Sequence, residues 1–188
     1  MKHIATVALL LNLGAAGLYA HEKPVNMRFS GSSAFSTVNL QQPNTNTAEE
    51  NVAGKGTLGS FTFRTMRAIA NSPATSDTCS GPSQLYFPSV SGAGIFRFQD
   101  GSLLKVNLIQ GGDCIDLVAF EGHCTLSLQI IGGTGRFKNA SGMLTFTETA
   151  VPVLADASNN PVFFTEKGEF TGTISGMDTE EERQDERE

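Results

Sequence analysis

Residues 132–142 read G-G-T-G-R-F-K-N-A-S-G, and this glycine-rich segment decides how the rest of the sequence is interpreted. Runs of alternating apolar residues flank it on both sides, so it is predicted to join two strands. Glycine adopts backbone angles that a Cβ forbids, which suits a tight connection. We therefore assign the segment a structural role, in which Phe137 fills one end of the fold. The residues that carry this role are Gly132, Gly133, Gly135, Phe137 and Gly142.

Alternation continues on both sides of this segment. Residues 92–99 and 102–109 alternate around Asp100-Gly101, a dipeptide that favours a type I′ hairpin turn. Residues 41–51 and 71–83 are polar and are predicted to be loops, as is a turn at 156–160. The other predicted strands are 26–30, 34–40, 58–69, 114–118, 124–131, 143–153 and 162–175.

The composition agrees with strands and turns. Charged residues make up 17% of the chain, which contains 20 Gly, 13 Phe and no Trp. No segment has the periodicity of an amphipathic helix, so the fold class is all-β, as an antiparallel barrel or sandwich. The predicted strands are long relative to a typical length of about 5–6 residues, which favours a barrel.

The two ends of the chain differ from its middle. Residues 1–20 have the basic start, apolar stretch and small final residue of a signal peptide, so we expect an exported protein, periplasmic or secreted. No other segment is apolar enough to span a bilayer. Residues 177–188 form an acidic tail that is expected to be disordered. A single barrel domain is expected over residues 21–176.

Export places the three cysteines in an oxidising compartment, where two of them are expected to pair. Cys114–Cys124 would join the two strands of one hairpin. Cys79–Cys114 would attach the 71–83 loop to the sheet. Cys124 is in phase with apolar residues of its strand, where a buried free thiol is common. We favour Cys79–Cys114 and keep Cys114–Cys124 as the alternative.

The sequence does not support binding of a nucleotide cofactor, a copper ion or a nucleic acid. Residues 54–59 match G-x-G-x-x-G, but a strand pattern follows where a dinucleotide site needs a helix. His21 would begin the mature chain, yet nothing places His123 beside it to complete a copper site. The net charge is −6 and no basic patch is present, so nucleic acid is not an expected partner. We expect neither a cofactor nor a metal.

Glu148 is the one candidate catalytic residue. It shares a strand face with Leu144 and Phe146, so it would enter an apolar interior if that face points inward. Desolvation would raise the pKa of its carboxyl and make it an acid or base. The preferred interpretation is structural, with the strand end at solvent or an arginine such as Arg64 paired with the carboxyl.

Residues 130–142 resemble the G-G-T-G-x-F-x-x-A-x-G motif of dirigent proteins, and the shorter G-T-G-x-F segment of allene oxide cyclases. The resemblance covers about the last third of the chain, whose ending is also similar to that of uncharacterised exported bacterial proteins. It implies an eight-stranded antiparallel barrel with an apolar lumen, commonly assembled as a homotrimer. The acidic pair that dirigent proteins carry on an early strand is not seen here, so no catalytic residue is carried over.

These observations leave three functions open. The first is a binding module that holds a small apolar molecule in the lumen. The second is a cofactor-free cyclase or isomerase that acts on a substrate in the same lumen. The third is a packed barrel with a structural or partner-binding role. The expected ligand-binding residues are Phe61, Phe63, Phe96, Phe98 and Phe146.

Overall fold

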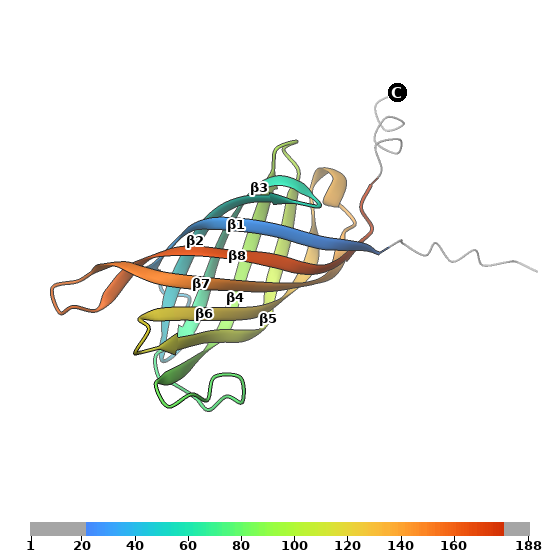
Figure 1. Cartoon of the computed structure of the whole chain (residues 1–188). Helices are drawn as coiled ribbons and strands as arrows, with labels where there is room; N and C mark the ends of the chain where they lie inside the picture. The colour runs from blue at the N-terminus through green and yellow to red at the C-terminus, as the bar shows by residue number, and fades with distance from the viewer. Residues whose placement is uncertain (1–21, 179–188) are drawn as a thin grey trace, which may run out of the picture.

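The computed structural model describes residues 22–178, which form a closed barrel of eight antiparallel strands (Figure 1). Each strand pairs with its neighbours in sequence, and β1 closes the barrel against β8. This confirms the predicted fold class. The strands are β1 (Lys23–Ser36), β2 (Thr45–Gly56), β3 (Gly59–Ala70), β4 (Gln84–Phe98), β5 (Leu103–Asp116), β6 (Glu121–Gly133), β7 (Ser141–Ala155) and β8 (Pro161–Ser175).

The antiparallel order gives the barrel two different ends. The β1–β2, β3–β4, β5–β6 and β7–β8 connections lie at one end, which we call the open end. The β2–β3, β4–β5 and β6–β7 connections lie at the other, which we call the closed end. The described chain also begins and ends there (Figure 1).

The glycine-rich segment covers the closed end. It connects β6 to β7 through a short 3₁₀ helix, η1 (Gly135–Phe137). Gly132 and Gly135 have φ values of 93° and 57°, which a residue with a Cβ adopts only with strain. Phe137 is fully buried and its ring lies 4.7 Å from that of Phe98. The segment is therefore a structural connection that seals this end of the barrel.

Phenylalanine rings fill the lumen behind this seal. The Phe63 and Phe96 centroids are 4.3 Å apart, and Phe170 lies 4.7 Å from Phe96 in an edge-to-face contact. The Phe63 ring passes over the position where a Cβ on Gly94 would stand, so the strand makes room for the ring. The closed half of the barrel is thus a packed core rather than an open lumen.

Several details of the predicted strand pattern are wrong. The predicted strands 26–30 and 34–40 are one strand, β1, which ends at Ser36, so residues 37–40 are not in a strand. Residues 45–51 belong to β2 rather than a loop, because β1 and β3 pair with them on both sides. Residues 102–109 and 114–118 are predicted as two strands, but the structure has one continuous strand there, β5, from Leu103 to Asp116. The Asp100-Gly101 turn has a positive φ at Gly101 but not at Asp100, so it is not type I′.

Cys79 and Cys114 are joined by a disulfide, the pairing favoured from the sequence. The bond attaches the loop between β3 and β4 to β5. All three cysteines lie in the described residues, and Cys124 is a buried free thiol.

Several sequence predictions concern residues outside the described range of 22–178. The signal peptide and His21 precede it, and residues 179–188 of the acidic tail follow it. Within the described residues, no helix has the length and apolar character needed to cross a membrane.

We predict that Gly133→Ala destabilises the barrel far more than Gly101→Ala. A Cβ on Gly133 would stand 1.9 Å from the Leu103 carbonyl oxygen, so backbone must move, at a cost of about 3 kcal/mol. A Cβ on Gly101 meets nothing within 4 Å, and its φ of 84° costs only about 1 kcal/mol. Urea denaturation of both variants measures the difference, and equal losses would contradict this account of the connection.

Candidate functional site

A ring of polar side chains crosses the lumen between the phenylalanine core and the open end. Each of the eight strands contributes one inward-facing member, and the side chains of Glu50, Arg67, Glu148 and Glu166 are all buried. We call this set the polar ring. Its members are Ser33, Glu50, Arg67, Ser89, Asp113, Cys124, Glu148 and Glu166.

Strand register brings these side chains to one level. Residues directly opposite each other on neighbouring strands point to the same face of a sheet. Ser33 lies opposite Glu50, and Cys124 lies opposite both Asp113 and Glu148. On other strand pairs the ring members are offset along the strands, since Arg67 lies opposite Ala48 and Glu166 lies opposite Ala150, and there the long side chains of Arg67 and Glu166 span the offset.

Arg67 is the centre of the ring. Its Nε donates a hydrogen bond of 2.7 Å to Glu50 Oε1. Its Nη1 and Nη2 donate to the two carboxylate oxygens of Asp113, at 2.6 and 2.9 Å, and Nη1 also donates to Ser89 Oγ at 2.9 Å. The guanidinium is therefore committed to Glu50 and Asp113, with a forked contact to Asp113 that suits its planar shape.

Glu148 and Glu166 receive much less from Arg67. The nearest Arg67 nitrogen, Nη2, is 3.9 Å from Glu148 Oε1, which is beyond hydrogen-bond distance. Within residues 22–178, Glu148 Oε2, Glu50 Oε2 and both oxygens of Glu166 are buried without a hydrogen-bond partner. One selected oxygen from each of these three carboxyls lies within 4.8 Å of the other two. The ring thus contains acceptors that its own donors do not satisfy.

Burial and mutual repulsion raise the pKa values of these acids. Burial raises the pKa of Glu148 well above its usual range, and the charges of Glu50 and Glu166 raise it further. Burial, with the charge of Glu50, raises the pKa of Glu166 to about 7. Ser33 lies near enough to lower that value slightly, although it does not meet hydrogen-bond geometry. Glu166 therefore gains and loses a proton near neutral pH.

Burial also affects the pKa values of the other titratable ring members, Glu50, Arg67 and Cys124. Burial raises the pKa of Glu50, and Arg67 opposes that rise. Burial alone would lower the pKa of Arg67, but the charges around it, first that of Asp113, raise it well above its usual value. Burial raises the pKa of the Cys124 thiol well above its usual value, so this thiol stays protonated.

A cavity of about 360 Å³ lies between the polar ring and the open end. Its inner wall includes one residue from each strand. On every strand this residue lies two residues along the chain from the polar-ring member, on the side of the open end. These residues are apolar, and small side chains at Ala48, Gly122 and Ala150 leave the space. The eight wall residues are Phe35, Ala48, Ile69, Phe87, Ile115, Gly122, Ala150 and Phe164.

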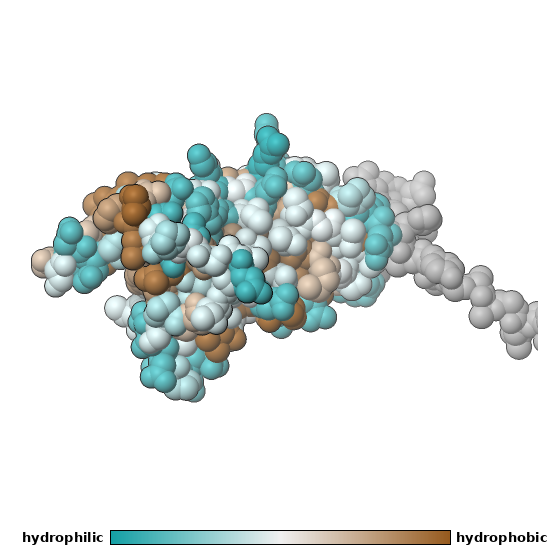
Figure 2. All heavy atoms as spheres, turned by 60° about the horizontal axis from the view of Figure 1, so that its bottom comes forward, coloured by the Kyte–Doolittle hydropathy of each residue, from teal (hydrophilic) through white to brown (hydrophobic). Residues whose placement is uncertain are grey.

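Apolar side chains also surround the entrance of the cavity. Leu117 and Phe120 of the β5–β6 turn belong to its lining, and Phe120 is 69% exposed. Leu154, near the β7–β8 turn, is 63% exposed. Figure 2 shows apolar residues gathered toward the end of the molecule at which the β7–β8 turn projects. The entrance therefore combines these apolar side chains with four polar residues that also line the cavity, Asn46, Asn71, Asp116 and Glu121.

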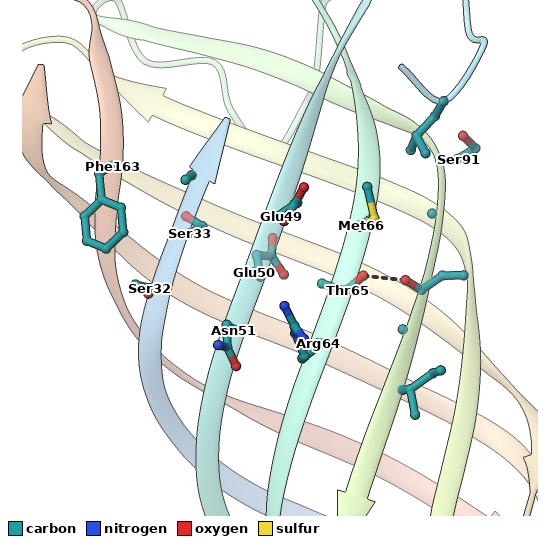
Figure 3. A pocket seen from close by; sticks show the side chains of 16 residues that line it. Ser32, Ser33, Glu49, Glu50, Asn51, Arg64, Thr65, Met66, Ser91 and Phe163 are labelled. Atoms are coloured by element: carbon teal, nitrogen blue, oxygen red, sulfur yellow. Dashed lines mark hydrogen bonds between the residues drawn. The ribbon is translucent and has the colours of Figure 1, made fainter. Parts of the chain in front are cut away.

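A second hollow, of about 920 Å³, lies on the outer side of β1 to β4 (Figure 3). Its lining includes outward-facing Arg64 and Met66 and the short residues Gly92 and Ala93. Thr65 Oγ1 donates a 2.8 Å hydrogen bond to the Ala93 carbonyl at its base. This hollow reaches Ser33 and Glu50 of the polar ring. The open-end cavity instead reaches Arg67, Asp113, Glu148 and Glu166, which is most of the charged part of the ring, so we place the candidate site there.

The structure places the predicted ligand-binding residues in the phenylalanine core and the predicted catalytic residue, Glu148, in the polar ring. Phe61, Phe63, Phe96, Phe98 and Phe146 are buried against one another or against Phe170, and in the described chain none of the five lines the open-end cavity. Glu148 does point inward and lines the cavity. Its neighbouring arginine is Arg67, whereas Arg64 is exposed.

Sequence reasoning missed most of the ring. Arg67, Glu50, Asp113 and Glu166 were not proposed as site residues, although each is a charged residue in a strand. The sequence did contain a clue to Arg67 and Glu166. Each lies an even number of residues from an inward-facing phenylalanine of the same strand, Phe63 and Phe170 respectively, and therefore shares its face. Phase alone does not show that these residues meet, because that depends on register.

The arrangement can exchange a proton or accept a cation. Glu148 and Glu166 can share a proton between their carboxyls, as closely spaced acids do. By distance, two sets of side chains could instead hold a metal ion, Glu50 with Glu148 and Glu166, or Asp113 with Cys124 and Glu148. Either occupant would relieve the excess of carboxylates over the single guanidinium.

Comparison with known proteins gives similarity to solved structures and no sequence match. The chain is similar to the solved structure of the pterocarpan synthase dirigent protein GePTS1, with 12% sequence identity and a TM-score of 0.35. The alignment covers 89% of this chain and 99% of that one. No family model and no curated protein sequence matches the chain. At this level of similarity no residue role is transferred.

We predict that Arg67→Met destabilises the protein by about 3 kcal/mol at pH 8, because it leaves Glu50 and Asp113 buried without their cation. Arg64→Met on the same strand is exposed and should change stability by less than about 0.5 kcal/mol. Urea denaturation at pH 8 and pH 5 checks this, with a smaller loss at pH 5, because burial raises the pKa of Glu50 and protonation removes its unpaired charge. Equal effects at the two positions would contradict the central role of Arg67.

The raised pKa of Glu166 predicts a pH-dependent stability. The folded protein holds this proton up to a pH of about 7, whereas the unfolded chain releases it near 4.5. The stabilisation is therefore complete below pH 4.5 and is lost as the pH rises through 7. We expect Glu166→Gln to reduce the slope of the curve between pH 5 and 8, leaving the part that Glu148 and Glu50 contribute, and to gain about 2 kcal/mol over wild type at pH 8.

Chemical denaturation across this pH range measures the effect. Glu169→Gln on the same strand is the control, since its side chain lies in the outward phase of β8. It should leave the slope of the wild-type curve unchanged. A wild-type slope that persists in Glu166→Gln would show that Glu166 is not the group responsible.

Proposed function

We propose that this protein is an exported binding protein that holds a small, largely apolar molecule in its open-end cavity. The observation that carries the proposal is the pairing of eight apolar wall residues with a buried polar ring beneath them. Ligand sites commonly combine apolar walls with a few fixed polar groups that orient the ligand. The volume of about 360 Å³ lies within the range of such sites.

The cavity and the phenylalanine core have separate roles in this proposal. The core rings at the closed end, such as Phe96 and Phe170, pack against one another and form a rigid base. The ligand lies above the polar ring, against side chains such as Ile69, Phe87 and Phe164. A barrel with a purely structural role would need neither this space nor the buried acids, whose desolvation costs stability.

Two further features support ligand capture outside the cytoplasm. Exposed apolar side chains around the entrance, such as Val118 and Phe120, offer a surface along which an apolar molecule enters. The disulfide Cys79–Cys114 is typical of proteins in an oxidising compartment, which agrees with the expected signal peptide.

Filling the cavity tests the proposal. We predict that Ala48→Phe places a ring in the cavity and weakens binding of the neutral fluorescent probe N-phenyl-1-naphthylamine at least tenfold. Ala53→Phe is the matched control, because Ala53 is exposed on the outer face of the same strand, β2. The probe should bind the wild type and this control alike, with a rise in fluorescence on binding.

Melting temperatures establish that both variants are folded. Should Ala48→Phe fail to fold, Ala150→Phe fills the same cavity from β7. Probe binding that is unchanged in a folded, cavity-filled variant would overturn the proposal.

A further inference from the structure

Three carboxyls of the polar ring lie close together, and each has at least one buried oxygen without a hydrogen-bond partner in the described chain. Glu50 Oε2, Glu148 Oε2 and the oxygens of Glu166 are buried and unpartnered within residues 22–178. These three residues each offer an oxygen within 4.8 Å of the other two. Glu148 and Glu166 also line the open-end cavity, so a molecule in the cavity can reach them.

The charges of the ring leave room for one more cation. Glu50, Asp113, Glu148 and Glu166 face a single guanidinium, and Arg67 spends its hydrogen bonds on Glu50, Asp113 and Ser89. Buried carboxylates of this kind need either a proton or an opposite charge. A ligand that brings a positive charge would supply what Arg67 does not.

We propose that the cavity selects molecules that carry a primary ammonium group on an apolar body, with the ammonium held by Glu50, Glu148 and Glu166. This inference rests on the proposed ligand-binding function and names the chemical class of its ligand. The apolar body contacts the cavity wall, and the ammonium points down into the ring. The three N–H donors of the ammonium match the three carboxyl acceptors one to one.

The geometry fits an ammonium. Three N–H···O hydrogen bonds of about 2.9 Å around a tetrahedral nitrogen place their acceptors roughly 4.6 Å apart. One oxygen each of Glu50, Glu148 and Glu166 lies within 4.8 Å of the other two, so the three acceptors are close enough together to surround one ammonium nitrogen.

A divalent metal ion fits the surroundings less well. Magnesium and calcium complete their shells with several further oxygen ligands, usually water. Here the space beyond Glu148 and Glu166 is walled by apolar side chains such as Ile69 and Ile115. Arg67 lies 3.9 Å from Glu148 and would repel a doubly charged ion more strongly than an ammonium.

The inference predicts tighter binding at higher pH. The groups that face Glu166 from the other strands are Ser33, Glu50, Arg67, Asp113, Cys124 and Glu148. Glu166 has a pKa of about 7, so it is protonated at pH 5.5 and ionised at pH 8. The ammonium must displace that proton at low pH, so its affinity rises with pH, whereas the affinity of a neutral ligand does not.

The test compares two molecules of nearly equal shape, 2-phenylethylammonium and 2-phenylethanol, by isothermal titration calorimetry on the wild-type protein. We expect the amine to bind at least tenfold more tightly than the alcohol at pH 8, and less than threefold more tightly at pH 5.5. Glu166→Gln should bring the ratio of the two affinities at pH 8 toward one. Glu169→Gln, which lies in the outward phase of the same strand, should keep the wild-type ratio.

The outcomes separate this inference from the proposed function. Equal affinity for the amine and the alcohol at pH 8 overturns the ammonium site and leaves ligand binding intact. Failure of amine, alcohol and N-phenyl-1-naphthylamine to bind overturns both. Calcium or zinc chloride is titrated in parallel, and competitive displacement of the amine by either ion would assign the carboxyls to a metal instead.

Discussion

The charge balance around Arg67 is the constraint on which the rest of the site depends. A buried guanidinium is stable only when carboxylates satisfy its donors, and Glu50 and Asp113 do so from β2 and β5. Because Arg67 itself stands on β3, these contacts connect three strands across the lumen. The same commitment leaves Glu148 and Glu166 with little positive charge nearby. Their raised pKa values, and the cation site inferred here, both follow from that shortage.

The lumen is packed on one side of the polar ring and hollow on the other, because the side chains on the two sides differ in volume. Toward the closed end, rings such as Phe63, Phe96 and Phe170 fill the barrel, and Phe137 seals it. Toward the open end, Ala48, Gly122 and Ala150 replace such rings and leave a cavity. The packed half excludes water from below the ring. The acids therefore lie in a buried layer, and a ligand in the open-end cavity can reach Asp113, Glu148 and Glu166.

Local periodicity explains which features could be predicted from the sequence. Alternation in residues 58–69 and 143–153, with the glycine-rich segment between strands, indicated a barrel and placed Glu148 on an inward face. The same reasoning failed for β2, whose sequence TNTAEENVAGKG is polar on both faces. The inward face of this strand carries Glu50 between Ala48 and Val52, so alternation is weak there. Pairing with β1 and β3 makes it a strand nonetheless.

The amino-acid sequence by itself determined the fold class, the connection at the closed end, the favoured disulfide and the strand face that Glu148 shares with Leu144 and Phe146. Only the tertiary structure decided that Glu148 meets Arg67, Glu50 and Glu166, and that the cavity lies above them rather than among the phenylalanines. The reason is that a period of two fixes the face on which a side chain lies, but not its height in the barrel. Height depends on the register of all eight strands and on closure of β1 against β8, which no local pattern encodes.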